Sequence, residues 1–372
     1  MPAGVPLQTL LKSKGQKATL ELKGQGGSFA TTTVAFGNPP QVFEAVIDIG
    51  ASDTFVPGPQ CAKNSSNCRE GAAYNATAST TYSYDGRTIA VDRNDRYTVG
   101  VLTKDSVHVG AIEVKDQVFE QASDVARRIG SGKVHYDTVL GLSREAVQMR
   151  SSSLQTKGTF QLATEQAVLE RNVFTLRLPG VDGYAGRLTL GWIDEQLTTG
   201  KAVARLPLIN SSAASPRHYA SGGWLVEAAS LNLDWHGQEM AFHTLADHSA
   251  IFSTVEPFSK FPADFVQQLL DLLDADENGT VDCAEAKAAP ELVISLPGTG
   301  ASMHRLVVKP RDYIRSEPKR ASVVEGRCYV PITPIEKSRD DPRQSITLGY
   351  LFLQRYYSIF DADERMVSLV EL

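Results

Sequence analysis

The chain has 372 residues, a formal net charge of −6 and a pI near 5.7. That length is too great for one small domain and suits two lobes of ordinary size. The acidic balance, without any basic block, argues against a nucleic-acid partner, and no apolar run approaches the ~20 residues that a membrane span requires. We therefore expect a globular protein, a monomer, with no membrane span.

The N-terminal stretch, residues 1–15, lacks the long apolar core of a signal peptide. The chain is therefore either a cytosolic protein or a mature form with an added Met1.

Short runs rich in β-branched and aromatic residues, broken by Gly, Pro, Asn and Asp, dominate the chain and predict a mostly β protein. In chain order, strands are expected within residues 17–22, 28–36, 41–48, 97–110, 174–180, 186–193, 292–298 and 303–309. Helical periodicity is sparse, and its two best candidates are residues 160–170 and 262–275.

Two acids each end or follow a partly apolar segment and precede a stretch that ends in proline. Asp48 lies in AVIDIGASDTFVP, and Asp247 lies in AFHTLADHSAIFSTVEP. A hydrophobic element with glycine follows each acid: Gly141 comes 93 positions after Asp48, and Gly349 comes 102 positions after Asp247. These matching elements, in the same order, indicate a duplicated β lobe with one site at the lobe boundary.

Four cysteines permit three complete pairings. Cys61 and Cys68 flank the short polar loop AKNSSN, which favours pairing them and leaves Cys283 to pair with Cys328. Four N-x-S/T sequons lie in polar or small-residue stretches where surface loops are expected. Paired cysteines and loop sequons together favour the secretory route, extracellular or vacuolar. The sequon asparagines are Asn64, Asn75, Asn210 and Asn278.

The segment DADENGTVDCAE fits the spacing of an EF-hand calcium loop, with Gly279 at its sharp turn. Against a calcium site, Pro290 shortens the exiting helix, no second EF-hand is present to pair with it, and a glycan on Asn278 would occupy a ligand. The alternative, which we favour, is an acidic, solvated turn between a helix and a strand, with no cofactor. The side-chain ligands of a calcium site would be Asp274, Asp276, Asn278, Asp282 and Glu285.

Several segments together resemble the pepsin-like aspartic peptidases over nearly the whole chain. GNPPQVF is similar to that family's G-T-P-P-Q turn, and VIDIGASDTFVP to its D-T-G-S-S-x-x-W-V-P segment. Further similar segments are DTVLGLS, GRLTLGWIDEQLTTG, TVDC and LGYLFLQRYYSIFDADERMVSLV.

This resemblance implies two mostly antiparallel β lobes with a cleft between them and a few short helices. We place the lobes at residues 1–178 and 179–372. It assigns Asp48 and Asp247 to a catalytic carboxylate pair, and it implies the disulfides Cys61–Cys68 and Cys283–Cys328. Two adjacent carboxylates share one proton and activate a water molecule, which attacks a peptide carbonyl. The two carboxylates titrate as a pair, so neither the acid nor the base role is assigned to one residue.

The motifs depart from the family pattern D-T-G-S/T in both lobes. The first reads Asp48-Ile49-Gly50-Ala51, and the second reads Asp247-His248-Ser249-Ala250. Hydroxyl groups that would lock the two loops together and donate to the acids are therefore missing. His248 is either a third catalytic group beside the acids or a packed replacement for threonine, and we favour the second interpretation.

The family's flap sequence Y-G-D-G falls on residues 92–95, so the flap tyrosine is absent unless Tyr97 is displaced into its role. The tryptophan after the first motif becomes Phe55. We assign four residues to ligand binding: Gly50, Phe55, Asp92 and Ser249.

Three functions remain open from the sequence. The first is an acid peptidase with unusual specificity that uses Asp48 and Asp247. The second is a peptidase fold that binds a peptide or protein without cleaving it. The third is a repurposed acid–base enzyme acting on a small molecule in the same cleft.

Overall fold

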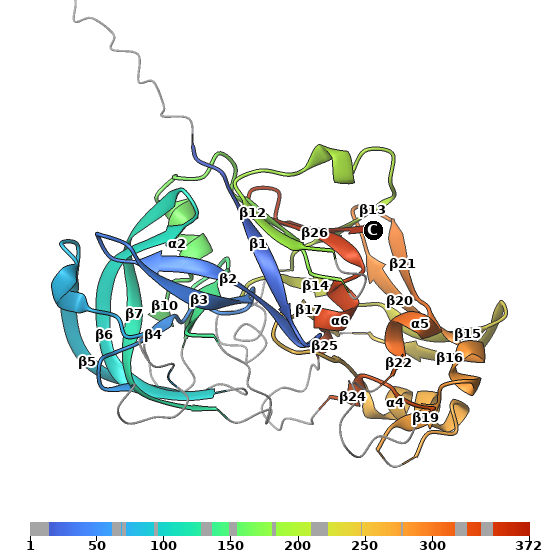
Figure 1. Ribbon diagram of the computed structural model, residues 1–372. Coiled ribbons are helices and arrows are strands. Elements are labelled where there is room, and N and C mark those ends of the chain that lie inside the picture. The colour runs from blue at the N-terminus through green and yellow to red at the C-terminus, as the bar shows by residue number, and fades with distance from the viewer. Residues whose placement is uncertain are drawn as a thin grey trace, which may run out of the picture.

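The computed structural model describes residues 15–61, 68, 72–92, 96–127, 136–148, 155–180, 184–209, 222–246, 248–276, 278–316, 326–335 and 345–372. Two β-rich lobes lie on either side of a central group of strands (Figure 1). The expected mostly β, two-lobed architecture with few helices is confirmed.

Six antiparallel strands in the order β13-β27-β26-β11-β12-β1 form the centre of the molecule. Leu20 and Leu22 on β1 are buried while Glu21 between them is exposed, which is the alternation expected of a half-buried strand. The strands are β1 (Ala18–Gln25), β11 (Val173–Arg177), β12 (Gly186–Leu190), β13 (Val203–Pro207), β26 (Tyr356–Asp361) and β27 (Met366–Glu371).

The N-terminal lobe continues the same hydrogen-bonded sheet from β1 into β2, and long hairpins dominate it. Its cis Asn38–Pro39 bond lies in the turn between the second and third strands, where GNPPQ predicts a turn. The strands are β2 (Phe29–Phe36), β3 (Gln41–Asp48), β4 (Phe55–Pro57), β5 (Ser83–Asp92), β6 (Arg96–Val109), β7 (Ile112–Arg127) and β8 (Thr138–Gly141), with the separate pair β9 (Val147–Gln148) and β10 (Gln155–Thr156).

Three smaller sheets of five, four and three strands build the C-terminal lobe. The five-stranded sheet contains β14 (Leu225–Glu227), β17 (Ser249–Phe252), β18 (Ser259–Phe261), β24 (Ile332–Pro334) and β25 (Ser345–Leu348). The four-stranded sheet contains β15 (Ser230–Trp235), β16 (Gln238–Thr244), β20 (Glu291–Pro297) and β21 (Met303–Val308). The three-stranded sheet contains β19 (Thr280–Asp282), β22 (Arg315–Ser316) and β23 (Arg327–Tyr329).

Both predicted helices are confirmed, as α2 (Thr159–Glu165) and α4 (Ala263–Leu272). Helix α4 buries Phe265, Val266 and Leu269, which lie three or four residues apart on one face. The other helices with bounds in the described residues are single turns: α5 (Pro310–Tyr313), α6 (Tyr350–Leu353), η1 (Ala76–Ala78), η2 (Glu195–Leu197) and η3 (Glu285–Ala288).

Aromatic side chains fill the core where the lobes meet the central strands. Phe174 stacks on Phe360 at a centroid distance of 4.7 Å, and Trp224 meets Phe360 edge-on at 5.3 Å. The Trp224 indole N–H donates to the carbonyl of Leu142 at 3.0 Å. A residue near the start of the C-terminal lobe is thereby fixed to the segment that follows β8, so the core spans the lobe boundary.

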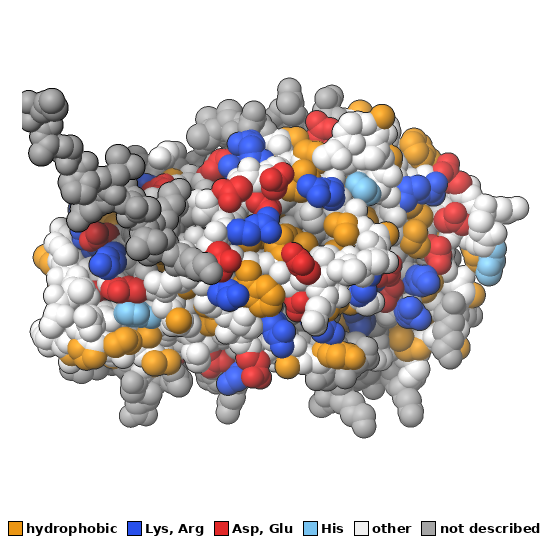
Figure 2. Space-filling view, turned by 90° about the horizontal axis from the view of Figure 1, so that it is seen from above, with side chains coloured by type: hydrophobic (Ala, Val, Ile, Leu, Met, Phe, Trp, Pro, Cys, Tyr) orange, Lys and Arg blue, Asp and Glu red, His pale blue; other side chains and the backbone are white. Residues whose placement is uncertain are grey.

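The face seen from above shows acidic and basic side chains interspersed (Figure 2). Within the described part of the chain, no helix is both long and apolar enough to cross a membrane. The division of the lobes at residues 178 and 179 stays a prediction, and it falls between β11 and β12, which are neighbours in the central sheet.

Candidate functional site

Asp48 is the last residue of β3 in the N-terminal lobe. Strand β3 runs parallel to β8, which places Asp48 opposite Gly141. The side chain is only 7% exposed. Its Oδ1 accepts the N–H of Gly50 at 2.9 Å, and its carbonyl accepts the N–H of Leu142 at 2.9 Å. The backbone of Gly50 thus holds the Asp48 carboxylate in place through one hydrogen bond.

The C-terminal lobe repeats this arrangement with a serine in place of the acid. Strand β17 runs parallel to β25 with Phe252 opposite Leu348. One residue further on, the N–H of Ser253 donates to the carbonyl of Leu348 at 3.0 Å. Ser253 therefore lies beside Gly349, as Asp48 lies beside Gly141.

The turns after these two positions match as well. A Cβ on Gly141 would lie 2.6 Å from the carbonyl oxygen of Ala51. A Cβ on Gly349 would lie 2.4 Å from the carbonyl oxygen of Phe258 and 2.8 Å from that of Glu256. Each glycine thus lets its strand approach the turn of its own lobe closely. Counting from these contacts, Ser253 is the counterpart of Asp48, and Glu256 is the counterpart of Ala51.

The sequence-based choice of Asp247 as the partner of Asp48 is wrong in register. Asp247 itself lies outside the described residues, but its neighbours Ala246 and His248 precede β17, whereas Asp48 ends β3. An extended chain rises about 3.3 Å per residue, so His248 and Ser253 are separated by roughly 16 Å. Sequence spacing offered a signal: Gly349 lies 96 positions after Ser253, nearer to the 93 of the first lobe than the 102 from Asp247.

Thr254, the residue after Ser253, joins the two lobes beneath the site. Its hydroxyl donates to the carbonyl of Ile47 at 2.7 Å and accepts the N–H of Ile49 at 3.3 Å. Ile49 is buried and belongs to the main apolar core, and its side chain has no hydroxyl with which to return the contact. The hydrogen bonds that Thr254 makes to the backbone beside Asp48 therefore have no counterpart from the side chain at position 49.

His248 and Ser249 lie at the end of β17 away from Ser253. The ring Nδ1 of His248 is 3.0 Å from the carbonyl oxygen of Ala246. The hydroxyl of Ser249 is 2.6 Å from that of Ser345, and its side chain is buried. Their predicted roles beside the acids do not fit these positions, because all of β17 separates His248 from Ser253, and Ser249 is the first residue of that strand.

Three other residues assigned to ligand binding have different surroundings. The amide N–H of Gly50 donates a hydrogen bond to the Asp48 carboxylate. Phe55 on β4 is buried in an apolar cluster with Val46 and Ala51, against which Val255 of the other lobe also packs. Asp92 ends β5 opposite Tyr97 on β6. The predicted flap residues 93–95 lie outside the described residues, and the ligand-binding roles stay predictions.

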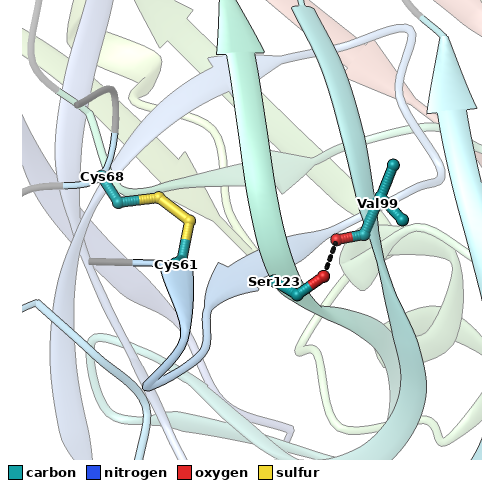
Figure 3. Close-up of a disulfide and its surroundings, with 4 residues drawn as sticks. All are labelled: Cys61, Cys68, Val99 and Ser123. Carbon is teal, nitrogen blue, oxygen red and sulfur yellow. Dashed lines mark hydrogen bonds between the residues drawn. A yellow bond between two sulfur atoms is a disulfide. The ribbon is translucent and has the colours of Figure 1, made fainter. Parts of the chain in front are cut away.

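Both predicted disulfides are confirmed. Cys61 and Cys68 form one of them and share an apolar cluster with Ala122 and Val125 of β7. Figure 3 shows this bond beside the hairpin of β6 and β7, in which the hydroxyl of Ser123 donates to the carbonyl of Val99 at 3.0 Å.

Cys283–Cys328 joins the segment after β19 to β23.

Two of the four sequon asparagines lie on described surface. Asn75 caps η1 and accepts the N–H of Thr77 at 3.1 Å, and both Asn75 and Asn278 are exposed. Asn64 and Asn210 lie outside the described residues. Glycosylation stays a prediction.

The EF-hand-like segment is a turn between α4 and β19. Oδ1 of Asp276 accepts the N–H groups of Asn278 and Thr280, both at 2.9 Å. The Arg327 guanidinium contacts Oδ2 of Asp276 at 2.9 Å and the carbonyl of Thr280 at 3.2 Å. Asp276 is one of the proposed calcium ligands, so a cation of the protein itself already contacts it. No cluster of three or more His, Cys, Asp or Glu side chains suited to a metal is found in the described ranges.

Comparison with known proteins agrees with the duplicated β architecture. The family model for eukaryotic aspartyl protease matches residues 30–372. A vacuolar protease A of Arthroderma otae is 26% identical over 343 residues, covering 91% of this chain and 77% of the relative. Cathepsin D of Dictyostelium discoideum is 24% identical, and the match covers 90% of this chain and 81% of the relative.

Gastricsin of Callithrix jacchus is 25% identical, and the match covers 90% of this chain and 79% of the relative. The family model matches most of the chain, and the fold has two β lobes with an acid at the end of β3. Together these observations identify the family. The chain belongs to the eukaryotic aspartyl protease family.

Proposed function

We propose that this chain is a non-catalytic member of its family, which binds a peptide or protein segment at the lobe boundary around Asp48 without cleaving it. The observation that carries the proposal is Ser253 at the position that corresponds to Asp48. The hydroxyl of Thr254 supports this register independently, because it contacts the backbone on both sides of Asp48.

The chemistry of an aspartic dyad needs two carboxylates that share one proton. One carboxylate removes a proton from the attacking water while the other donates to the developing oxyanion. A serine hydroxyl is a weak acid and a weak base without a neighbouring activator, so it replaces neither function. Loss of one member of a catalytic group that acts as a unit typically costs 10⁴-fold or more in rate.

Binding has fewer requirements than cleavage. The two lobes remain joined by Thr254, and Asp48 remains buried with a backbone donor. The Arthroderma otae relative is named as a protease, and a protease must hold a peptide before it cuts it. Retention of the fold with loss of one acid therefore favours a peptide-binding role over a different reaction.

A cleavage assay tests the proposal. Purified protein is incubated with a reduced and alkylated unfolded protein at pH 3 to 6, alongside an Asp48→Asn variant. We expect no cleavage by either, with both samples folded by circular dichroism. Cleavage by the parent that the Asp48→Asn variant loses would overturn the proposal and return the chain to the peptidases.

A compartment reached through the secretory pathway fits this proposal. Two disulfides require an oxidising environment to form and persist. Several relatives are named as vacuolar proteases. Digestion of the purified protein from its native source with an N-glycosidase, followed by mass measurement, tests this route through the exposed sequons Asn75 and Asn278.

A further inference from the structure

The two lobes present chemically different residues beside the site. In the N-terminal lobe, Ala51 and Phe55 follow Asp48 at three and seven positions, and both are buried in one apolar cluster. The residues at the same distances from Ser253 are Glu256 and Lys260. An apolar side on one lobe thus corresponds to a charged pair on the other.

Glu256 is held close to Ser253 by its backbone. Its N–H donates to the hydroxyl oxygen of Ser253 at 3.0 Å, and its carbonyl accepts the N–H of Tyr350 at 2.8 Å. The Glu256 side chain is 29% exposed. Its carboxylate is therefore partly shielded and is attached to a backbone whose position is fixed on both sides.

Lys260 reaches the same side of the sheet from another strand. Lys260 on β18 lies opposite Thr347 on β25, which lies opposite Ile251 on β17. Residues opposite one another share a face, and Ser253 lies two residues beyond Ile251 in an extended chain, so it shares that face too. The ammonium group of Lys260 contacts the Glu256 carboxylate at 3.1 Å, and its side chain is 33% exposed.

We propose that Glu256 selects ligands that carry a cationic side chain, and that Lys260 holds this carboxylate until the ligand replaces it. The inference rests on the proposed binding function. Asp48 and Glu256 each carry a carboxylate, and the Lys260 ammonium contacts that of Glu256. An incoming lysine or arginine side chain pairs with Glu256, and Lys260 swings into solvent on its flexible stem. An incoming carboxylate meets two acids and is disfavoured.

A peptide library tests this selection without a known ligand. The protein is immobilised through a terminal tag and exposed to a random octapeptide mixture, and retained peptides are sequenced by mass spectrometry. We expect Lys and Arg to be enriched at one peptide position by roughly tenfold over norleucine, the size of effect that one partly shielded ion pair supplies.

Variants assign the preference to this pair. Glu256→Gln should abolish the enrichment at that position and leave other positions unchanged, whereas Lys260→Met should strengthen it. Glu21→Gln, at an exposed position on β1, is the matched control and should bind as the parent does. Thermal melts exclude misfolding as the cause of a change.

Each result has one reading. Retention of peptides without any charge preference, or a basic preference that survives Glu256→Gln, overturns this inference and leaves the proposed binding function standing. Retention of no peptide by the parent contradicts the proposed function itself, and with it the selection.

Discussion

The hydroxyl of Thr254, in the C-terminal lobe, donates a hydrogen bond to the carbonyl of Ile47 in the N-terminal lobe at 2.7 Å. The same hydroxyl accepts the N–H of Ile49 at 3.3 Å. One side chain of the C-terminal lobe thus satisfies two backbone groups that flank Asp48. Because position 49 has no hydroxyl, stability at this boundary depends on Thr254 more than it would with a threonine on both sides.

Thr254→Val should therefore lower the free energy of unfolding by about 2 to 4 kcal/mol, because two buried backbone groups lose their partner. Thr254→Ser keeps the hydroxyl and should cost under about 1.5 kcal/mol, close to the loss of one methyl group. Urea unfolding followed by tryptophan fluorescence measures both. Equal stabilities of the two variants would show that the hydroxyl contributes little.

The two disulfides should differ in their contribution to stability. Cys283–Cys328 encloses a separation of 45 residues and Cys61–Cys68 one of 7. The chain-entropy relation gives about 4 kcal/mol for the longer loop and about 2.4 kcal/mol for the shorter. The double variants Cys283→Ala/Cys328→Ala and Cys61→Ala/Cys68→Ala, compared by denaturant midpoint, should rank in that order. The reverse order would mean that native packing outweighs loop entropy.

Strands, helices and the short cysteine loop were predicted well because each depends on residues that are close together in the sequence. The run QVFEAVID predicted β3 with the bounds that the structure has, since a short apolar run ends at an acid and a glycine lies two residues beyond it. The helix starting after Pro262 was predicted from its apolar face. The cysteine loop was predicted because Cys61 and Cys68 are close in sequence.

The sequence predicted Asp48 but not Ser253, for a physical reason. The search for a second acid at a strand end led to Asp247, because a serine at a strand end carries no charge that a pattern would flag. The identity of Ser253 as the counterpart of Asp48 depends on the pairing of β17 with β25, and that of Lys260 depends on β18 as well. Such register between distant segments is a property of the tertiary fold.

Buried tyrosines should make the protein sensitive to alkali. Burial raises the pKa of Tyr350 and of Tyr356 to about 12. Burial, followed by the hydrogen bond to Asp105, raises the pKa of Tyr74 well above its usual range. A raised folded pKa contributes stability that is full below the unfolded value near 10 and is lost as pH rises through the folded one.

We therefore expect these tyrosines to ionise only as the protein unfolds above about pH 11. Absorbance at 295 nm, recorded within seconds of a pH jump and again at equilibrium, separates exposed from buried phenols. A buried fraction that ionises at once at pH 10.5, with the circular dichroism unchanged, would contradict the expectation.

Calcium should leave the parent unaffected, because the Arg327 guanidinium already contacts the Asp276 carboxylate and the Thr280 carbonyl. We expect the melting temperature in 1 mM calcium to equal that in a chelator, to within about 1 °C, since a bound ligand would raise it. Arg327→Gln removes the competing cation and is the variant in which calcium dependence would emerge first. A clear rise for the parent would restore the EF-hand interpretation.

The counterpart relation of Asp48 and Ser253 can be tested by stability alone. Ser253→Asp would bring two carboxylates together, and one of them must then have a raised pKa because both cannot ionise easily. A raised pKa costs stability above the unfolded value near 3.9 and costs nothing below it. The variant should therefore match Ser253→Asn, the uncharged control of similar size, at pH 3.5 and fall below it by about 2 kcal/mol at pH 7.

Urea unfolding at intervals between pH 3.5 and 7 measures the difference between the Asp and Asn variants. A gap that opens as pH rises through 4 to 6 means that residue 253 senses the Asp48 charge directly. A gap that stays constant over this range would show that the two positions are not neighbours, and the register argument for a missing second acid would then fail.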